Sequence, residues 1–542
     1  MNAISYNSKR KFSILCRGKK ISREDLFQYT NGRFLVKEKE SRTQRYLKFN
    51  LDKLCALAAS AGNSNAPIRT IEKLEGGFSK ALILRKEDGT EVVAKLPFAI
   101  AGPPKYLTAS EAAVLQYLHD HTTIPVPKVL AWNPDPKNPV GAEYSIMEKA
   151  AGRQMVKKWG EMEDLSHLDF IKKLCSIEAD LAAIAFPANG SLYFRDSMEA
   201  SDKYIPLSPE MDPSGRFCIG PSCERSWSGK EKRTLYWSAL IEGHNTLLRP
   251  SLPAFGVALA EREIIARTEQ NPKIVPYGPP RASTEDQSAI LEIAKEVFLK
   301  MDAKTLPGRL PWPTLWHTDP HMGNIYVSDT EPTQITSVID WQSTVVSPLF
   351  YQVRFPEFIS IGEDYELGPK IPTLPENIND MDDNDQAIIR FKRKQTMLGK
   401  AYEAASGFKN KSVFKSLRLP PFFRQLFLHC GEAWEEGTVP LRTYLIAIAD
   451  VWNEAGFSGD CPCKFSEDEK QRYQQEFQEY RDHQKIYQIA REYIGTDTDG
   501  WIGPDDDFEE KQQRNKELLE LCMLHSAEYG KSAEEIWRIW PY

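Results

Sequence analysis

Between residues 68 and 97, hydrophobic and polar positions alternate, as they do around Ile71, Ile83 and Val92. A period of two predicts β-strands. Asp88-Gly89 separates two of these runs, and this dipeptide is typical of a tight hairpin. The region is therefore predicted to form a sheet that contains a hairpin.

Helices accompany this sheet in the sequence. Apolar residues at helical spacing predict a short docking helix over 51–61 and a second helix that begins near Thr108, a suitable N-cap. Two more strand-like runs follow at 128–132 and 143–149. Five short strands and one helix are thus predicted to form a small β-rich unit over 68–152.

Beyond that unit the hydrophobic period becomes that of helices. Helices are predicted over 165–186, 233–248, 254–267, 285–301 and 467–493, strands at 325–327 and 335–339, and irregular segments at 208–228 and 368–385. We therefore expect an amino-terminal arm (24–67), a β-rich lobe (68–152), a helical lobe (153–367), a loop (368–385) and a helical extension of that lobe (386–542).

Composition narrows the function classes. The 542 residues are 41% hydrophobic and 27% charged, which is typical of a globular chain. No apolar run approaches the roughly 18 residues that a transmembrane helix needs. A net charge of −7 argues against a dedicated nucleic-acid binder. The nine cysteines are scattered, which indicates reduced thiols, and nothing in the sequence requires an obligate protein partner.

The amino terminus is basic. Residues 1–23 contain seven lysines and arginines and no acid until Glu24. This composition suits a mitochondrial transit segment, and it suits an ordinary solvated tail of a cytoplasmic protein equally well.

Residues 315–341 carry the most informative chemistry. His317, Asp319 and Asn324 have the His-x-Asp-x-x-x-x-Asn spacing of a kinase catalytic loop, and Asp340 ends an apolar strand 21 residues after Asp319. In such a loop the first aspartate accepts the proton of the acceptor hydroxyl, while the asparagine and the later aspartate hold magnesium. The spacing therefore indicates phosphoryl transfer.

This segment also permits another interpretation. His317, Asp319 and His321 form His-x-Asp-x-His, a plausible ligand set for zinc in a metallohydrolase. Taken alone, the segment leaves the kinase and the metallohydrolase hypotheses close together.

The predicted sheet favours the kinase hypothesis. Gly76 and Gly77 lie between two strands, where backbone N–H groups can approach a phosphate. Lys95 lies within a strand, and an inward-facing lysine there needs a charged partner. Glu111, on the next helix, is a candidate partner, although Thr108-x-x-Glu111 is also a capping box. The order of these residues along the chain is that of a kinase.

On these residues the chain resembles the aminoglycoside phosphotransferase family of protein-kinase-like small-molecule kinases. The arm, with Tyr-Thr-Asn-Gly-Arg-Phe at 29–34, further resembles the fungal mitochondrial subgroup named for altered inheritance of mitochondria. The resemblance implies a two-lobed α+β fold of the protein-kinase type, with ATP and Mg²⁺ as cofactors. The roles it implies are Asp319 as catalytic base, Asn324 and Asp340 as magnesium ligands, Lys95 as phosphate anchor paired with Glu111, Gly76 and Gly77 at the phosphates, and Met147, Glu148 and Ala150 in the adenine-binding hinge.

Three departures from the family pattern refine the prediction. Thr318 stands where protein kinases have arginine, Trp341-Gln342 replaces Phe-Gly, and the glycine loop is short. No Ala-Pro-Glu follows Asp340, so an activation segment that docks a protein substrate is not expected. The sequence thus predicts ATP- and magnesium-dependent phosphorylation of a hydroxyl on a small molecule. A nucleotide-binding scaffold without turnover is the alternative from another class.

Overall fold

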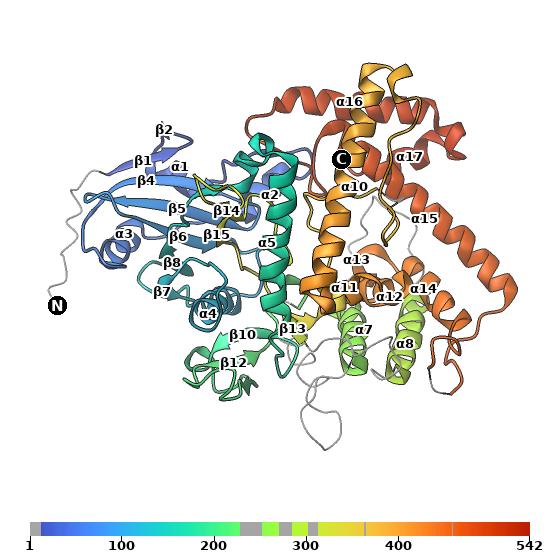
Figure 1. Ribbon diagram of the computed structural model, residues 1–542, viewed down its shortest axis with the longest axis horizontal. Helices are drawn as coiled ribbons and strands as arrows, with labels where there is room; N and C mark the ends of the chain where they lie inside the picture. The colour runs from blue at the N-terminus through green and yellow to red at the C-terminus, as the bar shows by residue number, and fades with distance from the viewer. Residues whose placement is uncertain (1–11, 228–251, 270–283, 302–312, 363–364, 458) are drawn as a thin grey trace.

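The computed structural model describes residues 12–227, 252–269, 284–301, 313–362, 365–457 and 459–542. Within these ranges the chain forms a lobe built on a sheet and a lobe built mostly of helices, side by side (Figure 1). This is the predicted two-lobed α+β fold of the protein-kinase type. The helix predicted at 233–248 lies outside the described residues.

One seven-stranded sheet forms the first lobe, in the order β2-β1-β4-β5-β6-β8-β7. All neighbouring strands are antiparallel except β1 and β4, which are parallel. The strands are β1 (Ser13–Cys16), β2 (Lys19–Lys20), β4 (Ile68–Glu75), β5 (Ser79–Lys86), β6 (Glu91–Pro97), β7 (Val129–Asn133) and β8 (Tyr144–Glu148). The five strands from β4 to β8 match the predicted ones, whereas β1 and β2 come from residues that were predicted to form a leader or a tail.

The alternation of side chains gives this sheet two different faces. On the outer face, buried residues such as Leu82 and Ala94 pack against α3 (Leu51–Ser60). On the inner face, Val93 packs in the core that α4 (Tyr106–His121) shares with the second lobe. Helix α4 begins before Thr108, at the N-cap Lys105, so the predicted N-cap is wrong. The hydroxyl of Thr108 instead donates to Glu143 Oε2 at 2.9 Å.

Three small sheets carry the segments that connect the lobes. Strand β14 (Ile325–Val327) lies between β15 (Ile335–Val338) and β9 (Arg153–Gln154), and β13 (Pro313–Leu315) pairs with β16 (Val346–Pro348). The predicted loop at 208–228 is partly wrong, because it contains β12 (Phe217–Gly220), which pairs with β10 (Ser191–Phe194) and β11 (Ile205–Pro206). All four residues of β12 are buried, and this burial explains why an apparently irregular segment forms a strand.

The second lobe is mostly helical. Helices α5 (Asp164–Ala182) and α10 (Asp383–Lys409) stand together at its centre, and α7 (Leu252–Glu269) packs on α8 (Thr284–Lys300) (Figure 1). The remaining helices there are α9 (Leu349–Gln352), α11 (Lys411–Leu417), α12 (Pro421–Gly431), α13 (Ala433–Glu436), α14 (Val439–Asp450), α15 (Glu467–Ile494), α16 (Phe508–Leu524) and α17 (Ala533–Ile539).

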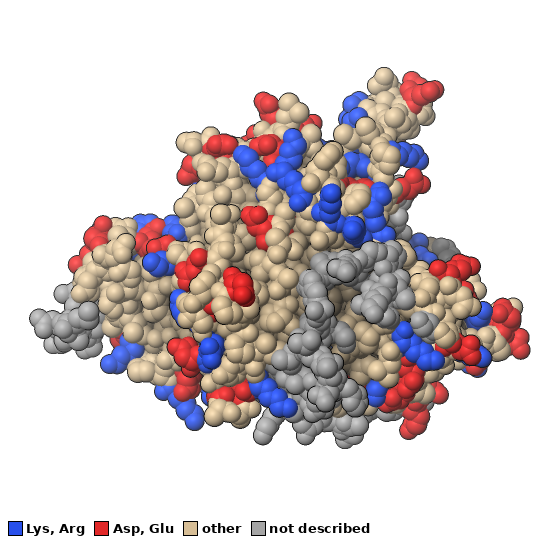
Figure 2. Space-filling model, turned by 60° about the horizontal axis from the view of Figure 1, so that its bottom comes forward, with Lys and Arg blue, Asp and Glu red and all other residues tan. Residues whose placement is uncertain are grey.

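The amino-terminal arm contacts the carboxyl-terminal region. Strand β17 (Trp501–Ile502) pairs with β3 (Arg33–Phe34) in the amino-terminal arm, which also carries α1 (Arg23–Phe27) and α2 (Glu38–Gln44). The carboxyl-terminal region therefore reaches back to the first lobe. Figure 2 shows acidic and basic side chains interspersed over the visible face, with several basic ones gathered in its upper part. Among the described residues, no helix has the length and apolarity that crossing a bilayer requires.

Candidate active site

Lys95 joins the two lobes through an ion-paired cluster. It is only 8% exposed, and its Nζ lies 2.6 Å from Glu111 Oε1 on α4 and 2.5 Å from Asp340 Oδ1, two residues beyond β15. Burial by itself would lower the pKa of Lys95, but Asp340 and Glu111 raise it above its ordinary value. Lys95 is therefore an ammonium ion held between two carboxylates.

The position of Glu111 decides between its two predicted roles. Because α4 is capped at Lys105, Glu111 lies inside the helix and does not form a capping box with Thr108. Its side chain is buried and turned to Lys95. A glutamate on this helix that pairs with the strand lysine is the arrangement that phosphoryl transfer requires in kinases.

The loop between β13 and β14 presents Asp319. The Asp319 side chain is 68% exposed, whereas Asn324 is buried and its Nδ2 donates to the Asp319 carbonyl at 3.1 Å. That bond turns the amide nitrogen away and leaves Asn324 Oδ1 as the acceptor atom for a ligand. The Ile339 N–H donates to the Asn324 carbonyl at 2.9 Å, so Asn324 lies beside the residue that precedes Asp340.

His317 supports this loop and does not fit the zinc hypothesis. Its Nδ1 accepts the Asp319 N–H at 3.3 Å, so its Nε2 carries the proton that is donated to the Ile339 carbonyl at 2.9 Å. Burial lowers its pKa, which keeps the ring neutral. With both nitrogens engaged, His317 offers no lone pair, and the proposed His-x-Asp-x-His ligand set is wrong.

Asp340 has an unusual backbone conformation. Its φ of 63° lies in the left-handed region, which non-glycine residues rarely adopt. Burial alone would raise the pKa of Asp340, but the ion pair with Lys95 lowers it below its ordinary value. One of its oxygens meets Lys95 and its side chain is 40% exposed. Asp340 and Asn324 thus offer a carboxylate and an amide oxygen, the ligand types that magnesium prefers.

A cleft of about 650 Å³ opens between the lobes and the arm. Leu74 and Ile83 line it from the sheet, Tyr326 from β14 and Gln154 from β9, and none of these four was predicted. None of the predicted site residues is among the residues that line this cleft. Ile83 pairs with Val93, two positions before Lys95 on the same face of β6, so the cleft wall and the lysine share one face. The period-two alternation could have identified Leu74 and Ile83 as cleft residues.

The predicted hinge residues lie near the cleft but do not line it. Met147 pairs with Val93 and Val129 inside the sheet, and its side chain is buried. The Glu148 N–H donates to the Lys128 carbonyl at 2.9 Å. Neither residue lines the cleft, and neither does Ala150, although Lys149 and Gly152 on either side of it do. The residues of this segment that face the cleft are therefore Lys149 and Gly152, and not the predicted Met147, Glu148 and Ala150.

The predicted phosphate turn lies between β4 and β5. A Cβ atom added to Gly76 or Gly77 would meet no atom within 4 Å, so open space lies above both residues. Neither glycine has a positive φ. The backbone of this turn is thus accessible to a ligand, as the prediction requires.

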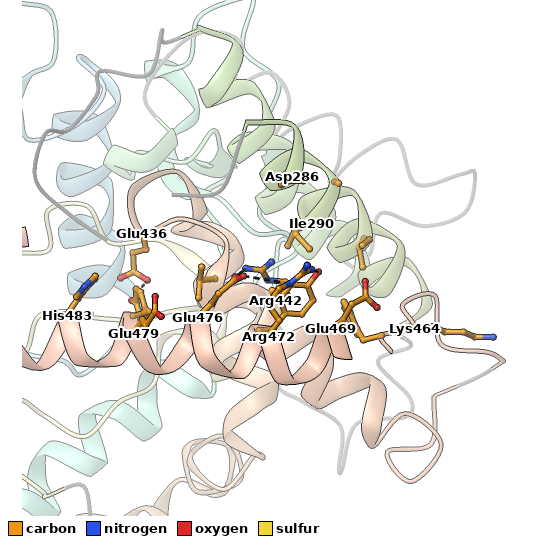
Figure 3. Close-up of a pocket in the computed structure, with 16 residues that line it drawn as sticks. Asp286, Ile290, Glu436, Arg442, Lys464, Glu469, Arg472, Glu476, Glu479 and His483 are labelled. Atoms are coloured by element: carbon orange, nitrogen blue, oxygen red, sulfur yellow. Dashed lines mark hydrogen bonds and ion pairs between the residues drawn. The ribbon is translucent and has the colours of Figure 1, made fainter. Parts of the chain in front are cut away.

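A further cavity, of about 720 Å³, lies in the second lobe between α8, α14 and α15 (Figure 3). Arg442 is its central cation, ion-paired with Glu476 and stacked 3.8 Å from the centroid of the Tyr473 ring. None of the predicted site residues lines it.

The two-lobed fold and the Lys95 cluster define the class of the protein as a kinase-like phosphotransferase scaffold. The sequence profile of the phosphotransferase enzyme family matches residues 70–353, just over half of the chain, from β4 to the end of α9. The chain belongs to this family, and the resemblance found in the sequence is confirmed.

Curated relatives extend the similarity beyond the family segment. A protein of Aspergillus fumigatus (strain CBS 144.89) named as a subtelomeric hrmA-associated cluster protein is 30% identical over 86% of this chain and 95% of its own length. The Yarrowia lipolytica protein named altered inheritance of mitochondria protein 9, mitochondrial, is 21% identical over 90% of this chain and 86% of its own length. A solved structure from Ralstonia eutropha, assigned as an aminoglycoside phosphotransferase, is 14% identical, with a TM-score of 0.36 and coverage of 80% of this chain and 97% of that chain.

Proposed function

We propose that the protein transfers the γ-phosphoryl group of ATP to a hydroxyl group of a small molecule in a magnesium-dependent reaction. The observation that carries this proposal is the cluster in which Lys95 joins Glu111 and Asp340 across the two lobes, on the same face of the sheet as the cleft. A buried lysine with these two partners has the geometry that anchors a triphosphate.

Asp319 is the proposed catalytic base. Its exposed carboxylate accepts the proton of the acceptor hydroxyl while the hydroxyl oxygen forms a bond to the γ-phosphorus. The bond between that phosphorus and the β–γ bridging oxygen breaks, and ADP leaves. The hydrogen bond between Asn324 Nδ2 and the Asp319 carbonyl holds the loop in place.

Asn324 and Asp340 are the proposed ligands of magnesium. The bound cation supplies positive charge that neutralises the phosphate oxygens during transfer. Asp340 is held by Lys95, and Asn324 is tied to the neighbouring Ile339. Both side chains are thereby oriented before the metal binds.

In this proposal the adenine end of the nucleotide lies in the cleft of about 650 Å³, and the phosphates extend beyond the residues that line it to Lys95, on the same face of the sheet. The segment from Lys149 to Gly152, which includes the predicted hinge residue Ala150, offers backbone groups to adenine. The Gly76 N–H donates to the Ser79 carbonyl at 3.0 Å, so the turn offers the Gly77 N–H to the phosphates.

The acceptor is proposed to be a small molecule. Thr318 stands where protein kinases have the arginine that holds a phosphorylated activation segment, and no Ala-Pro-Glu follows Asp340. A phosphorylated loop would lack that pairing charge.

The test is a screen of small-molecule hydroxyl compounds with ATP and Mg²⁺, read out as acceptor-dependent ADP formation. Asp319→Asn is the matched control, because the amide keeps the shape of the side chain and cannot accept the proton. We expect at least one acceptor for the wild type and a loss of about 10²- to 10⁴-fold in Asp319→Asn. Equal turnover by both proteins would contradict catalysis at this site, and ATP binding without turnover on any acceptor would favour the scaffold hypothesis.

We also propose a mitochondrial location. The basic amino terminus supports it, as do the low-identity relatives named as mitochondrial. Because β1 begins at Ser13 and pairs with β4, cleavage after residue 23 would remove two strands of the sheet, so we confine the proposed leader to residues 1–11. The full chain with a carboxyl-terminal fluorescent protein should co-localise with mitochondria and lose this when Lys9, Arg10 and Lys11 become Gln. A cytosolic wild-type fusion would overturn the proposal.

A further inference from the structure

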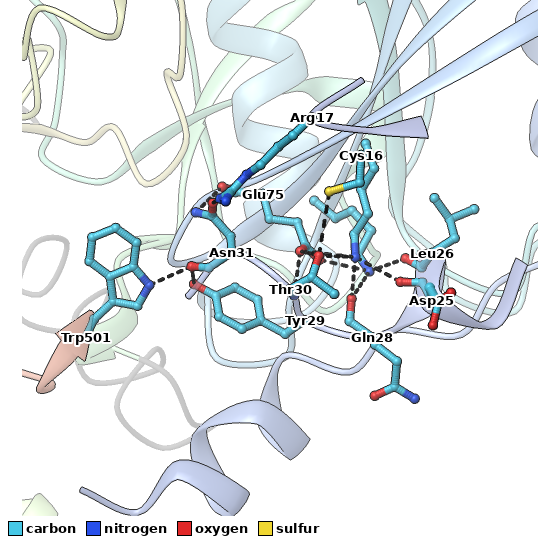
Figure 4. Close-up of polar contacts among 12 residues, drawn as sticks. Cys16, Arg17, Asp25, Leu26, Gln28, Tyr29, Thr30, Asn31, Glu75 and Trp501 are labelled. Carbon is cyan, nitrogen blue, oxygen red and sulfur yellow. Dashed lines mark hydrogen bonds and ion pairs between the residues drawn. The ribbon is translucent and has the colours of Figure 1, made fainter. Parts of the chain in front are cut away.

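The arm motif Tyr-Thr-Asn-Gly-Arg-Phe at 29–34 has no role assigned in the proposed function, although Thr30 and Asn31 line the cleft and the motif lies beside the predicted phosphate turn (Figure 4). In Figure 4, Thr30 and Asn31 from the arm meet Glu75 at the end of β4, and Tyr29 and Trp501 both meet Asn31. Three segments far apart in the sequence thus converge beside Gly76 and Gly77.

Asn31 is the centre of these contacts. Its Nδ2 donates to the Glu75 carbonyl at 2.7 Å, and its Oδ1 accepts from Arg17 at 2.9 Å. Its own carbonyl accepts from the Tyr29 hydroxyl at 2.9 Å and from Trp501 Nε1 at 2.7 Å. Asn31 therefore connects the Glu75 peptide, which precedes the turn, with Arg17 near β1 and with Trp501 in β17.

Arg45 holds the other side of the turn. Its Nε donates to the Gly77 carbonyl at 3.0 Å, and its NH1 donates to the Ser41 carbonyl at 3.0 Å. The guanidinium is buried and stacks 4.7 Å from the centroid of the Phe34 ring. Asp499 lies 3.6 Å away and supplies a negative charge. Because these contacts fix the guanidinium, its hydrogen bond also fixes the direction of the Gly77 carbonyl.

The Glu75 carboxylate fastens the arm to the sheet. Its Oε2 accepts from the Thr30 N–H at 2.8 Å and from the Thr30 hydroxyl at 3.0 Å. Lys73 and Lys80 each lie 3.1 Å from this carboxylate, and both also donate to the Gln28 carbonyl. The first residue before the glycines is thus anchored through its side chain as well as its backbone.

The carboxyl-terminal strand completes the arrangement. Gly32 has a φ of +111°, and a Cβ atom there would lie 2.3 Å from the Ile502 carbonyl and 2.4 Å from Trp501 Nε1. Only glycine allows β17 to approach this closely. Each residue from Tyr29 to Phe34 therefore contributes to one contact region between the arm, β17 and the turn.

Holding the carbonyls of the turn has a consequence for its N–H groups. The peptide unit is planar and trans, so the Phe78 N–H points away from Arg45 when the Gly77 carbonyl points towards it. Within the described part of the chain, neither the Gly77 nor the Phe78 N–H has an acceptor. Two donors are thus left for a ligand: the Phe78 N–H, in the peptide that Arg45 holds, and the Gly77 N–H, in the peptide before it.

We propose that residues 29–45 fix the Gly76–Gly77 turn so that the N–H groups of Gly77 and Phe78 face the phosphates of the bound nucleotide, with Asn31 and Arg45 as positioning residues. This inference rests on the proposed function and adds a role for the arm. It also gives a physical reason why a turn with only two glycines suffices, because the arm supplies the rigidity that further sequence constraints would otherwise provide.

The test compares Asn31→Asp and Arg45→Met with Arg42→Met, an exposed arginine on the same arm, in the full-length protein. Asn31→Asp keeps the shape of the side chain but removes the donor to the Glu75 carbonyl. Asn31→Leu, which removes the same donor without adding a negative charge beside the cleft, is measured with it and should show the same effects. Two quantities are measured: hydrogen exchange of the peptide that spans residues 74–80 without nucleotide, and the affinities for ATP with Mg²⁺ and for adenosine. Adenosine has no phosphates, so a general loss of folding would weaken both ligands alike.

We expect faster exchange in the turn and about tenfold weaker ATP binding for Asn31→Asp, with unchanged adenosine binding, since one hydrogen bond is lost. Arg45→Met should act in the same direction and Arg42→Met should change nothing. Unchanged ATP affinity in Asn31→Asp, or equal weakening of ATP and adenosine, overturns this inference alone. A wild type that binds no ATP overturns the proposed function and the role of the turn together.

Discussion

Two buried lysine clusters lie on opposite faces of the same sheet. In the β5–β6 ladder, Lys80 pairs with Leu96 and the neighbouring Ala81 pairs with Lys95, so Lys80 and Lys95 point to opposite sides. Lys95 faces the second lobe and meets two carboxylates, Glu111 and Asp340. Lys80 faces the arm, where it shares the single carboxylate of Glu75 with Lys73.

The two clusters differ in charge balance, and their pKa values shift in opposite directions. Burial lowers the pKa of Lys80 to about 8. The carboxylate that Lys80 shares with Lys73 and the backbone carbonyls that it contacts do not compensate for the loss of hydration. The two carboxylates raise the pKa of Lys95. The Lys95 cluster has more negative than positive charge, and its Asp340 is half-exposed, so it is suited to bind a cation. The Glu75 cluster has no exposed carboxylate, so it is suited to hold the arm against the sheet.

The largest expected effect is on the arm side. Glu75 is 2% exposed, and Glu75→Gln leaves two buried ammonium groups without a counter-charge. We expect the free energy of unfolding to fall by about 3–5 kcal/mol in denaturant titrations. Glu72→Gln, on the same strand but outside this cluster, is the control. Similar losses in both variants would show that the arm-side cluster is not the joint we describe.

Lys95→Met should break the cleft-side cluster in a different way. Once an acceptor is known, we expect kcat/KM to fall by at least about 100-fold, because the triphosphate loses its fixed cation. Lys80→Met is the matched control, since it removes a lysine from the adjacent strand on the opposite face. The comparison fails if Lys80→Met lowers kcat/KM as much as Lys95→Met does.

The pH dependence of stability should separate the clusters. The pKa of Lys80 is about 8 in the folded protein and 10.5 is its ordinary value, so between these pH values the unfolded chain binds more protons. Lys80 therefore contributes a rise in stability with pH across this window, of about 2 kcal/mol, and Lys80→Met should remove that contribution. Urea titrations at pH 8 and pH 10.5 measure it, and an equal rise in Lys80→Met would assign it to other groups.

The smallest effect concerns the carboxyl-terminal contact. Trp501→Phe keeps an aromatic ring but removes the Nε1–H donor to the Asn31 carbonyl. We expect a loss of about 1 kcal/mol of unfolding free energy. Trp537→Phe, whose side chain is half-exposed, should cost less. The reverse order of the two losses would contradict the proposed tie between the ends of the chain.

The parts of the fold that depend on local pattern were predictable. Alternation located β4 to β8, and helical spacing located α5, α7, α8 and α15 to within a few residues. The spacing from His317 to Asp340 indicated that Asp319 and Asn324 share one loop and that Asp340 follows the second strand after it. These features repeat over many neighbouring residues, so the sequence carries their signal.

The parts that depend on distant partners were not predictable. Strands β3 and β17 have two residues each, and Phe34 and Trp501 pair across most of the length of the chain. Strand β1 forms because the edge of β4 is free to accept it, which no local pattern shows. Likewise, only the fold shows that His317 uses both ring nitrogens in the loop and that Thr108 donates to Glu143.

The central claim is that the protein binds ATP with magnesium through Asp340 and Asn324. Its most direct test is the thermal stability of the full chain with ATP and Mg²⁺, with each alone, and with zinc alone. We predict stabilisation by about 2.7 kcal/mol with ATP and Mg²⁺ at a hundredfold excess over the dissociation constant, a much smaller gain in Asp340→Asn, and none with zinc alone. An unchanged melting temperature with ATP and Mg²⁺, together with stabilisation by zinc, would contradict the account.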